Sequence, residues 1–508
     1  MFIRIHSAAI IGLTCLPITA EVDISGSWPG FQVIGLPDTA IQEAKERIRT
    51  AWKNSGLSFP SNSRVVINLA PADVKKEGTS FDVPMALAMY LASEKTQLDL
   101  SRALFVGELA LNGQVRPVPG VLPITLFAKD RGYTAFFVPA ENVAEASIIE
   151  GIDIYPIQSL TQLIHHITGQ KKIAPAPTQP ITDIPRGETH TVDMADIAGQ
   201  PFAKRALEIA AAGGHNLLFS GPPGSGKTLL ATAFPSILPR MTTKEVTEVT
   251  AIYSVAGLLP KDTPTILQRP FRTPHHSASL VALVGGGARP QPGEVSLAHR
   301  GVLFLDELPE FPRCVLESLR QPLEGGVVHI SRAHGRVQYP ARFTLIASYN
   351  PCPCGFASDP EKECLCSVAE ISRYQKKMSG PLLDRIDLHV EVPRVDIHKL
   401  TETGQAEPSE VVRKRVDLAR TQQQNRFQAT LYVTNSDIGA RDIQRFCSLP
   451  PPVLTFLQQA GKNLYLSGRS LHKVIKVART IADLDLKEKI EVPHIAEALQ
   501  FRKREKYT

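Results

Sequence analysis

The chain has little of several features that mark specialised protein classes. Only 6% of its 508 residues are aromatic, and no segment reaches 18 consecutive apolar residues, which excludes a polytopic membrane protein. It also lacks internal repeats and low-complexity tracts, which argues against fibrous and broadly disordered classes. The net charge is only +6, which permits a polyanionic partner without requiring one. What remains is an ordinary soluble chain, long enough for about three to four domains.

Cysteine is scarce and unevenly placed. The chain has seven cysteines, and four of them, Cys352, Cys354, Cys364 and Cys366, lie within fifteen residues. An odd, clustered set is a poor disulfide framework, so we expect a reducing, cytoplasmic compartment. Four soft thiolates suit a structural Zn²⁺, although the C-x-C spacing is tighter than usual. Reduced cysteines without a metal are the alternative.

The N-terminus has two interpretations. Arg4 and the apolar stretch 8–16 resemble a short signal peptide. However, Pro17 interrupts the stretch, and residues 21–24 alternate between polar and apolar like a strand. We interpret the segment as a folded strand and expect no membrane association.

The composition changes along the chain predict an α/β protein in four parts. Residues 1–168 mix strand-like runs with helical segments such as 39–55, and residues 169–190 are a proline-rich linker. A second α/β block covers 191–393, and 394–508 is mostly helical. From 411 to 508 there are 18 Lys and Arg against 9 Asp and Glu, so this part has a surplus of nine and the rest a net −3. The basic surplus is either a nucleic-acid contact or a solvated helical face.

Residues 217–231 contain the pattern of a nucleotide phosphate loop. A hydrophobic strand, LLFS, precedes GPPGSGKT at 221–228, and a helical sequence follows. In such a loop the backbone N–H groups surround phosphate oxygens at the start of a helix. We expect Lys227 to bridge the β- and γ-phosphates of ATP and Thr228 to ligate Mg²⁺. The expected ATP-binding residues are Gly221, Pro222, Pro223, Gly224, Ser225, Gly226, Lys227 and Thr228.

Two later strands end in polar residues that suit ATP hydrolysis. The strand at 301–305 is followed by Asp306 and Glu307, and the strand at 343–349 by Asn350. We expect Asp306 beside the Mg²⁺ and Glu307 where it can orient and deprotonate the attacking water. Asn350 can hydrogen-bond the γ-phosphate or that water. Phosphoryl transfer needs positioning and charge neutralisation above all, and these residues supply both.

This set of motifs resembles the AAA+ ATPases, especially their replicative-helicase and magnesium-chelatase branch. The resemblance places Arg385, in SGPLLDRID, at the arginine finger that reaches a neighbouring subunit's site. It places Arg469, in LSGRSLH, at the second sensor, at the start of a lid helix. The planar, permanently charged guanidinium suits a developing phosphate charge, and a surface salt bridge is the alternative for each arginine. The finger implies that activity requires a ring.

Two segments exceed a minimal ATPase core, at 271–287 and 325–339. The second predicts a β-hairpin with a basic tip, where Arg332, His334 and Arg336 can contact DNA phosphates; a purely structural hairpin is the alternative. The two segments resemble the helix-2 insert and pre-sensor hairpin that line the pore in the same AAA+ branch. The pair His275 and His276 does not predict a metal site, because adjacent side chains point apart on most backbones and we expect no carboxylate nearby.

The front domain resembles a Lon-type protease, with a ribosomal S5 domain 2-like fold. Residues 68–87 resemble the nucleophile region, with Ser80 at the serine position, and 107–122 resemble the strand pair that follows. The lysine that activates the serine in that family is replaced by Leu122, which cannot accept a proton. We therefore expect a non-proteolytic domain that serves assembly or nucleic-acid contact. Lys129 is the nearest downstream candidate for a substitute lysine.

Over nearly the full chain, the combined motifs resemble the YifB/ComM family of magnesium-chelatase-like, competence-related ATPases. The motifs are VIGLPD (33–38), LAPAD (69–73), HHSAS (275–279), GEVSLAH (293–299), DELPEF (306–311) and VARTIAD (477–483). The resemblance implies a homo-hexameric, ATP- and Mg²⁺-dependent helicase that acts on single-stranded and branched DNA and drives branch migration during natural transformation. One alternative is a chelatase motor subunit that powers metal insertion through partners, although the Lon-like front domain is not expected there. The other is a nucleotide-switched DNA-binding scaffold, which could lose Glu307.

Overall fold

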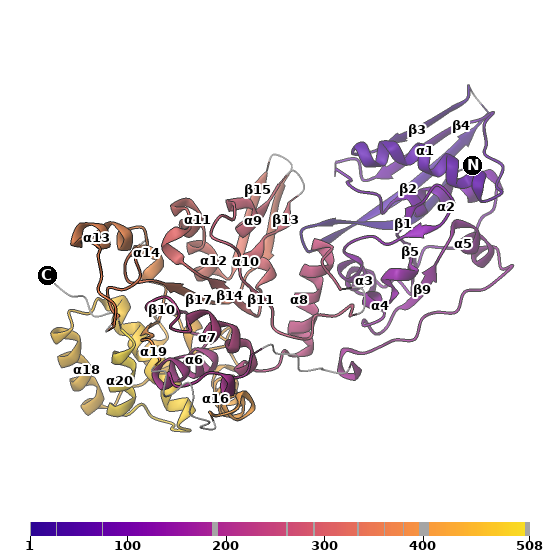
Figure 1. Ribbon diagram of the computed structural model, residues 1–508. Coiled ribbons are helices and arrows are strands. Elements are labelled where there is room, and N and C mark those ends of the chain that lie inside the picture. The colour runs from indigo at the N-terminus through magenta and orange to yellow at the C-terminus, as the bar shows by residue number, and fades with distance from the viewer. Residues whose placement is uncertain are drawn as a thin grey trace.

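The computed structural model describes three parts that follow one another along the chain (Figure 1). The described residues are 2–26, 28–73, 75–184, 192–260, 263–287, 290–332, 335–359, 361–378, 380–395 and 406–502. An N-terminal domain is built on a mixed sheet, a central domain on a parallel sheet, and a C-terminal lid on helices. Within these ranges, no helix is both long and apolar enough to cross a membrane.

The N-terminal domain is a seven-stranded sheet in the order β3-β4-β2-β1-β5-β8-β9. Its strands are β1 (Phe2–Ile11), β2 (Thr14–Ser25), β3 (Gly30–Ile34), β4 (Arg64–Ala70), β5 (Ala103–Phe105), β8 (Ala135–Pro139) and β9 (Asp153–Ile157), with β6 (Glu108–Leu109) and β7 (Val115–Arg116) as a separate pair. Its helices are α1 (Thr39–Asn54), α2 (Asp82–Ser93), α3 (Val121–Asp130), α4 (Val143–Ala146) and α5 (Leu160–Ile167). The strand expected near the N-terminus is therefore present, as half of the β1–β2 hairpin.

The local sequence explains why β2 is a strand and α1 a helix. In β2, Ile18, Ala20 and Val22 are buried at every second position, as a strand with one covered face requires. In α1, the side chain of Asp38 accepts a hydrogen bond from the backbone N–H of Ile41 at 2.9 Å and caps the helix. Ile48 is among the buried residues on the helix face that the 3.6-residue period predicted.

The central domain is a five-stranded parallel sheet in the order β11-β14-β17-β10-β18. Its strands are β10 (Leu217–Ser220), β11 (Phe271–Arg272), β14 (Val302–Leu305), β17 (Thr344–Tyr349) and β18 (Leu388–Glu391), with the pairs β12 (Gly285–Gly286) and β13 (Gln291–Pro292), and β15 (Val327–Arg332) and β16 (Gly335–Pro340). Its helices are α6 (Pro201–Gly213), α7 (Lys227–Ala233), α8 (Thr243–Ala256), α9 (Leu280–Val284), α10 (Glu294–Leu297), α11 (Arg313–Ser318), α12 (Arg320–Gly325), α13 (Val368–Lys376) and α14 (Gly380–Leu383). Because the strands are parallel, the carboxyl ends of β10, β14 and β17 meet at one edge, where α/β proteins bind ligands.

The lid shares its hydrophobic core with the central domain. Its helices are α16 (Ser409–Phe427), α17 (Ile443–Phe446), α18 (Pro451–Asn463), α19 (Gly468–Leu484) and α20 (Val492–Gln500). One cluster of buried residues joins Ala206 and Leu207 of α6 to Val416 of α16 and Val477 of α19. The lid is therefore packed onto α6 rather than tethered beside it.

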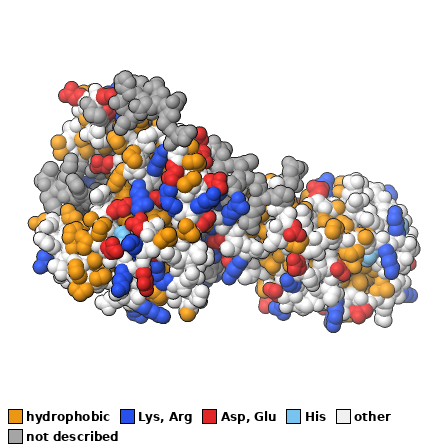
Figure 2. All heavy atoms as spheres, turned by 90° about the horizontal axis from the view of Figure 1, so that it is seen from below, with side chains coloured by type: hydrophobic (Ala, Val, Ile, Leu, Met, Phe, Trp, Pro, Cys, Tyr) orange, Lys and Arg blue, Asp and Glu red, His pale blue; other side chains and the backbone are white. Residues whose placement is uncertain are grey.

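Many cations of the lid are used in this packing. Arg415 pairs with Glu208 of α6, and Arg426 and Arg479 both contact the fully buried Asp483. Arg420 donates two hydrogen bonds to the carbonyl of Ala211. On the face shown in Figure 2, Lys and Arg side chains are interspersed with Asp and Glu. Much of the basic surplus that the sequence located in the lid thus stabilises the fold.

Helix α8 joins the N-terminal domain to the central domain. A hydrophobic cluster combines Leu122 of α3 with Val249 and Ile252 of α8. The hydroxyl of Ser254 donates a hydrogen bond of 2.7 Å to the buried carboxyl of Glu145, and burial raises the pKa of Glu145 despite three donors. The two domains therefore share a buried interface.

A second junction lies at the tip of the β1–β2 hairpin. A Cβ at Gly12 would lie 2.5 Å from Val337 Cγ1 of β16, and Gly12 has φ +67°. Leu13 packs against hydrophobic clusters of both domains. The N-terminal domain therefore contacts the hairpin of the central domain at the middle of β16.

The proline-rich segment predicted as a linker follows the surface of the N-terminal domain. Residues 172–180 contain no helix or strand, and a 3₁₀ turn follows at Ile181–Asp183. The backbone N–H groups of Ala176 and Gln179 donate to the carbonyls of Ile154 and Ser147, and Ile181 is buried in the cluster shared with α8. This part is extended, as its prolines predict, but anchored by Ile181; residues 185–190 lie outside the described residues.

Candidate nucleotide site

The phosphate loop, residues 221–228, connects β10 to α7. Gly224 and Gly226 have φ of +75° and +90°, and a Cβ at either would meet no atom within 4 Å. A Cβ at Gly221 would lie 2.1 Å from the carbonyl oxygen of Val392. The loop therefore needs glycine for its own backbone at these positions, and the open space beside Gly224 and Gly226 fits phosphate oxygens.

Lys227 is held inside this loop. Its Nζ donates hydrogen bonds of 2.8 Å to the carbonyls of Gly221 and Pro222 and one of 3.2 Å to Oδ1 of Asn350. Burial lowers the pKa of Lys227, while the charges of Asp306 and Glu307 act in the opposite direction. The structure thus brings Lys227 and Asn350 together, as expected for two residues that contact the same phosphate group.

Asp306 and Thr228 are also in direct contact. The hydroxyl of Thr228 donates to Asp306 Oδ2 at 2.9 Å, and the hydroxyl of Ser348, on β17, donates to Asp306 Oδ1. A hydroxyl and a carboxylate side by side are oxygen ligands of the kind that Mg²⁺ prefers. Ser348 was not predicted from the sequence; its position two residues before Asn350 is the signal that places it on the same strand end.

Glu307 follows Asp306 with its side chain 54% exposed. Its backbone is in the left-handed region, with φ +53°, which is uncommon for a residue with a Cβ. Nδ1 of His276 lies 3.7 Å from Oε2 of Glu307, and the rings of His275 and His276 are 4.0 Å apart. The expectation that these histidines have no carboxylate nearby and diverge is therefore wrong, because the chain folds back to bring 276 beside 307.

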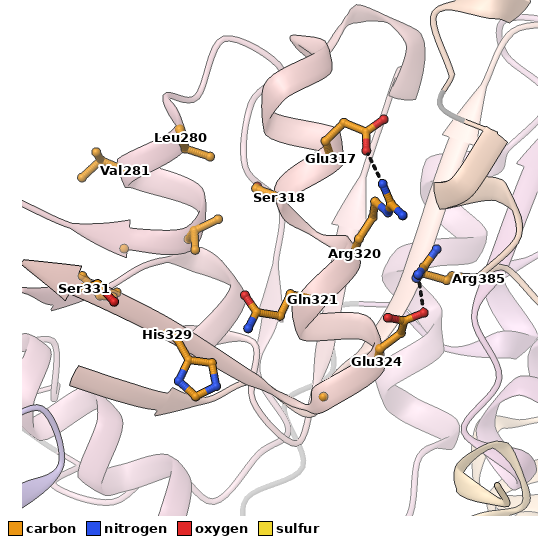
Figure 3. A pocket seen from close by; sticks show the side chains of 14 residues that line it. Leu280, Val281, Glu317, Ser318, Arg320, Gln321, Glu324, His329, Ser331 and Arg385 are labelled. Carbon is orange, nitrogen blue, oxygen red and sulfur yellow. Dashed lines mark hydrogen bonds and ion pairs between the residues drawn. The ribbon is translucent and has the colours of Figure 1, made fainter. Parts of the chain in front are cut away.

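Arg385 lies away from these groups, on another surface of the domain. It lines a cavity of about 830 Å³ between α9, α12 and β15 that contains none of the phosphate-loop residues. Its guanidinium donates to the carboxylate of Glu324 on α12 and to the carbonyl of Pro381. Figure 3 shows Arg385 directed toward Glu324, and Arg320 toward Glu317. Sequence reasoning missed Glu324, which is 61 residues from Arg385 in the chain.

Arg469 is exposed in the first turn of α19, after the N-cap residue Ser467. None of the contacts within the described residues joins it to the phosphate loop or to Asp306. The structure therefore assembles Lys227, Thr228, Asp306 and Asn350 in one site, and leaves Arg385 and Arg469 outside it.

The four clustered cysteines follow Asn350 in the chain, and their side chains lie close together. The Sγ atoms of Cys352, Cys354, Cys364 and Cys366 all lie within 4.8 Å of one another. Separations of 3.3 Å and 3.6 Å from Cys352 to Cys354 and Cys364 approach the sulfur spacing of tetrahedral zinc sites, about 3.8 Å for bonds of about 2.3 Å. Hydrogen bonds from the backbone N–H of Phe356 and then from Cys352 lower the pKa of Cys354 to about 6, whereas contacts with the other thiols raise the pKa of Cys364 and Cys366. The donor set fits Zn²⁺.

The hairpin expected to contact DNA is formed by β15 and β16. Arg336 is exposed and lies opposite Ser331 in the register. Arg332 closes β15, opposite Gly335. His334 lies outside the described residues, as does the side chain of Arg332. The first of the two inserted segments contributes α9 and β12.

The positions that correspond to the protease-like motifs lie in α3 and in the segment before α2. Leu122 is fully buried in α3, where its backbone N–H donates to Glu145. Lys129 is exposed two turns further along α3. Lys76, four residues before Ser80, is fully buried, and its ammonium donates to the carbonyl of Pro71.

Comparison with known proteins agrees with this architecture. Three family models match successive parts of the chain: Subunit ChlI of Mg-chelatase at 20–142, Magnesium chelatase, subunit ChlI at 193–400, and Magnesium chelatase, subunit ChlI C-terminal at 406–502. A shorter match of 123 residues, 24% of this chain and 22% of the relative, is 31% identical to Lon protease 2 of Bacillus subtilis.

Two relatives match almost from end to end. The chain is 44% identical to Competence protein ComM of Haemophilus influenzae over 98% of this chain and 97% of the relative. It is 43% identical to the protein YifB of Salmonella typhimurium over 98% and 96% of the two chains. Similarity of this extent shows that the chain belongs to the YifB/ComM family, related to magnesium chelatase subunit ChlI and of the AAA+ ATPase type.

Proposed function

We propose that this protein is a ring-forming, Mg²⁺-dependent ATPase that translocates on DNA and promotes branch migration during natural transformation. The observation that carries the proposal is the convergence of Lys227, Thr228, Asp306 and Asn350 at one edge of the parallel sheet. The name of the relative from Haemophilus influenzae, a competence protein, supports the biological setting. A cytoplasmic location is part of the same proposal.

Each residue of the site has a role in hydrolysis. The loop N–H groups and Lys227 would bind the phosphates. Thr228 and Asp306 would hold a Mg²⁺, which would neutralise charge on the phosphates. Glu307 orients the attacking water and takes its proton. Asn350, which accepts a hydrogen bond from Lys227 at 3.2 Å, would also hydrogen-bond the terminal phosphate and so link it to the end of β17.

We propose a homo-hexamer, and the position of Arg385 outside the nucleotide site of its own chain supports it. Arg385 lines a cavity separate from the phosphate loop. Its side chain is 12% exposed and paired with Glu324, so a neighbouring subunit's nucleotide would have to draw it away from Glu324, after which its charge would stabilise the transition state. We place Arg469 at the same nucleotide as a second sensor. Within the ring, Arg336 and the hairpin that carries it would contact single-stranded and branched DNA.

The cysteine cluster is proposed to hold a structural Zn²⁺ that fixes the loop 352–366 behind Asn350. The front domain is proposed to be non-proteolytic, because Leu122 occupies the position of the base and is buried against α8. That domain supports the pore hairpin instead, through the contact between Gly12 and Val337.

A direct test uses a fluorescently labelled four-way DNA junction and the full-length protein. With ATP and Mg²⁺ the protein should convert the junction to its branch-migration products, and Glu307→Gln should not. The matched control is Glu150→Gln, an exposed acid of the N-terminal domain. If the wild-type protein binds the junction and hydrolyses ATP but never moves the branch point, the translocase proposal fails.

The family models favour one second candidate, a chelatase motor subunit. In that case ATP turnover should be stimulated by the partner subunits of a chelatase and not by DNA. The same turnover assay with each addition separates the two candidates.

A further inference from the structure

Exposed cations gather in one pocket of the central domain. The pocket, of about 410 Å³, lies between the start of α11 and the face of α13. Its charged lining residues are Arg313, Arg373, Lys376, Lys377 and Glu310. All four cations are exposed, whereas several cations of the lid, such as Arg415, Arg420 and Arg426, are paired or bonded to carbonyls. We call this site the α11–α13 pocket.

The charges of the α11–α13 pocket are unbalanced. Lys377 pairs with Glu310 at 3.3 Å. Arg313, Arg373 and Lys376 form no ion pair within the part of the chain that the structure describes. Arg373, Lys376 and Lys377 are spaced at three and four residues, which places them on one face at the end of α13. Like charges so arranged repel each other, and a bound polyanion would relieve that repulsion.

Two features hold the α11–α13 pocket in place: the cysteine loop 352–366 on one side and the turn after Glu307 on the other. The N-cap residue of α13, Ser367, directly follows Cys366, and Gln375 donates to the carbonyl of Pro351 at 3.1 Å. On the other side, Glu310 ends the 3₁₀ turn Leu308–Glu310 that begins directly after Glu307. The cations are thus held between the cysteine loop and the residue expected to activate water.

We infer that the α11–α13 pocket binds phosphate groups of a DNA strand, as a contact separate from the β15–β16 hairpin. The inference rests on the proposed action on DNA. Arginine forks and lysine ammonium groups are the side chains that contact backbone phosphates without reading sequence. A protein partner would need apolar contacts at the centre of the surface, but the apolar lining residues Pro309 and Phe311 are buried.

The α11–α13 pocket lies close in the chain to Glu307, so a bound phosphate can affect the segment that carries this residue. A phosphate that binds Lys377 competes with Glu310, and Glu310 is three residues from Glu307 on one short turn. Phe311, next along the chain, makes an edge contact of 6.5 Å with the ring of His276, which approaches Glu307. Binding of a strand in the α11–α13 pocket therefore acts on a segment that adjoins the catalytic carboxylate.

The test measures the salt dependence of DNA binding. Full-length Arg373→Gln/Lys376→Gln is compared with wild type and with Lys53→Gln/Lys244→Gln, which removes the same charge at two exposed sites elsewhere. Fluorescence anisotropy with a labelled single-stranded oligonucleotide gives the affinity across a KCl series. For two lost phosphate contacts, the slope of log K against log salt should become shallower by about 1.4, because each contact contributes about 0.7. The control slope should equal that of wild type.

Three other outcomes are informative. If wild type binds DNA and the pocket variant keeps its slope, the inference is overturned and the proposed function stands. If the control variant loses as much slope as the pocket variant, the effect comes from net charge rather than from the pocket, and the inference is again wrong. A wild-type protein that binds no DNA would reject the proposed function itself. Equal thermal transitions of all three proteins show that the substitutions leave the fold intact.

Discussion

The hydroxyl of Thr228 donates a hydrogen bond of 2.9 Å to Asp306, although the two residues are 78 positions apart in the chain. The contact joins the start of α7 to the end of β14 and defines the place of the Mg²⁺ in the proposed site. Lys227 and Asn350 meet beside it at 3.2 Å. The site is thus built where three parallel strands end, and its chemistry can be tested residue by residue.

Glu307→Gln should bind ATP but hydrolyse it about 10²–10⁴-fold more slowly, because the amide cannot accept the proton of the attacking water. Phosphate release measures hydrolysis, and a fluorescent nucleotide measures binding. Glu150→Gln, which changes an exposed acid of the N-terminal domain, should keep wild-type turnover. Normal hydrolysis by the Glu307 variant would remove this residue from the mechanism.

Arg385→Ala and Glu307→Gln should each be inactive alone but partly active when mixed. In a mixed ring, some interfaces pair an intact Glu307 from one subunit with an intact Arg385 from the next. Turnover is measured as a function of the mixing ratio at constant total protein. Strictly additive, near-zero activity at every ratio would show that Arg385 does not act across subunits.

Glu324→Gln should alter how turnover depends on protein concentration. In the single chain the carboxylate of Glu324 holds the guanidinium of Arg385, so a neutral amide should release the arginine and shift half-maximal activity to lower concentration, by roughly 2- to 10-fold if the pair contributes about 0.5–1.5 kcal/mol. Glu317→Gln, on the same helical region and paired with Arg320, is the control. An unchanged concentration dependence would rule out a restraining role for Glu324.

Wild-type protein should contain about one zinc per chain, and Cys352→Ser/Cys354→Ser should contain close to none, because two of four thiolate ligands are lost. Metal content is measured by mass spectrometry of protein purified without chelator. Cys314→Ser, which alters an exposed cysteine outside the cluster, should leave the metal content unchanged. Equal zinc in the double variant and wild type would dismiss the site.

The attachment of α8 should weaken in acid. A hydrogen bond from His299, followed by Arg300, lowers the pKa of Glu248 from 4.5 to about 2 despite partial burial. A carboxyl with a depressed pKa in the folded state contributes stability above pH about 4.5, and this contribution is lost as the pH falls toward 2. The temperature of thermal unfolding should therefore fall less over that interval in Glu248→Gln than in wild type. Identical pH profiles would contradict the assignment.

Sequence patterns predicted what is local in this protein. The phosphate loop is one continuous segment, and the Asp306–Glu307 pair ends a uniformly apolar strand, so both could be located without the fold. The helix α1 and the strands β4, β8 and β17 follow from hydrophobic period in the same way. The cysteines could be grouped because they are near in sequence.

Contacts between distant segments could not be predicted. The approach of His276 to Glu307 and the pairing of Glu324 with Arg385 each depend on how α/β crossovers return the chain. The count of Lys and Arg in residues 411–508 also overstated the positive charge that is free to bind a partner. Arg415, Arg420 and Arg426 form contacts inside the lid and with α6. A net charge records how many cations a segment has, but not which of them reach solvent.

The central claim is that ATP hydrolysis at Lys227, Asp306 and Glu307 is coupled to DNA. The most direct measurement is ATP turnover by the full-length protein without DNA and with single-stranded, duplex and four-way DNA, beside Glu307→Gln. The account predicts that single-stranded or four-way DNA raises wild-type turnover several-fold and that the variant stays inactive with every substrate. Wild-type turnover that is identical with and without all three forms of DNA would contradict it.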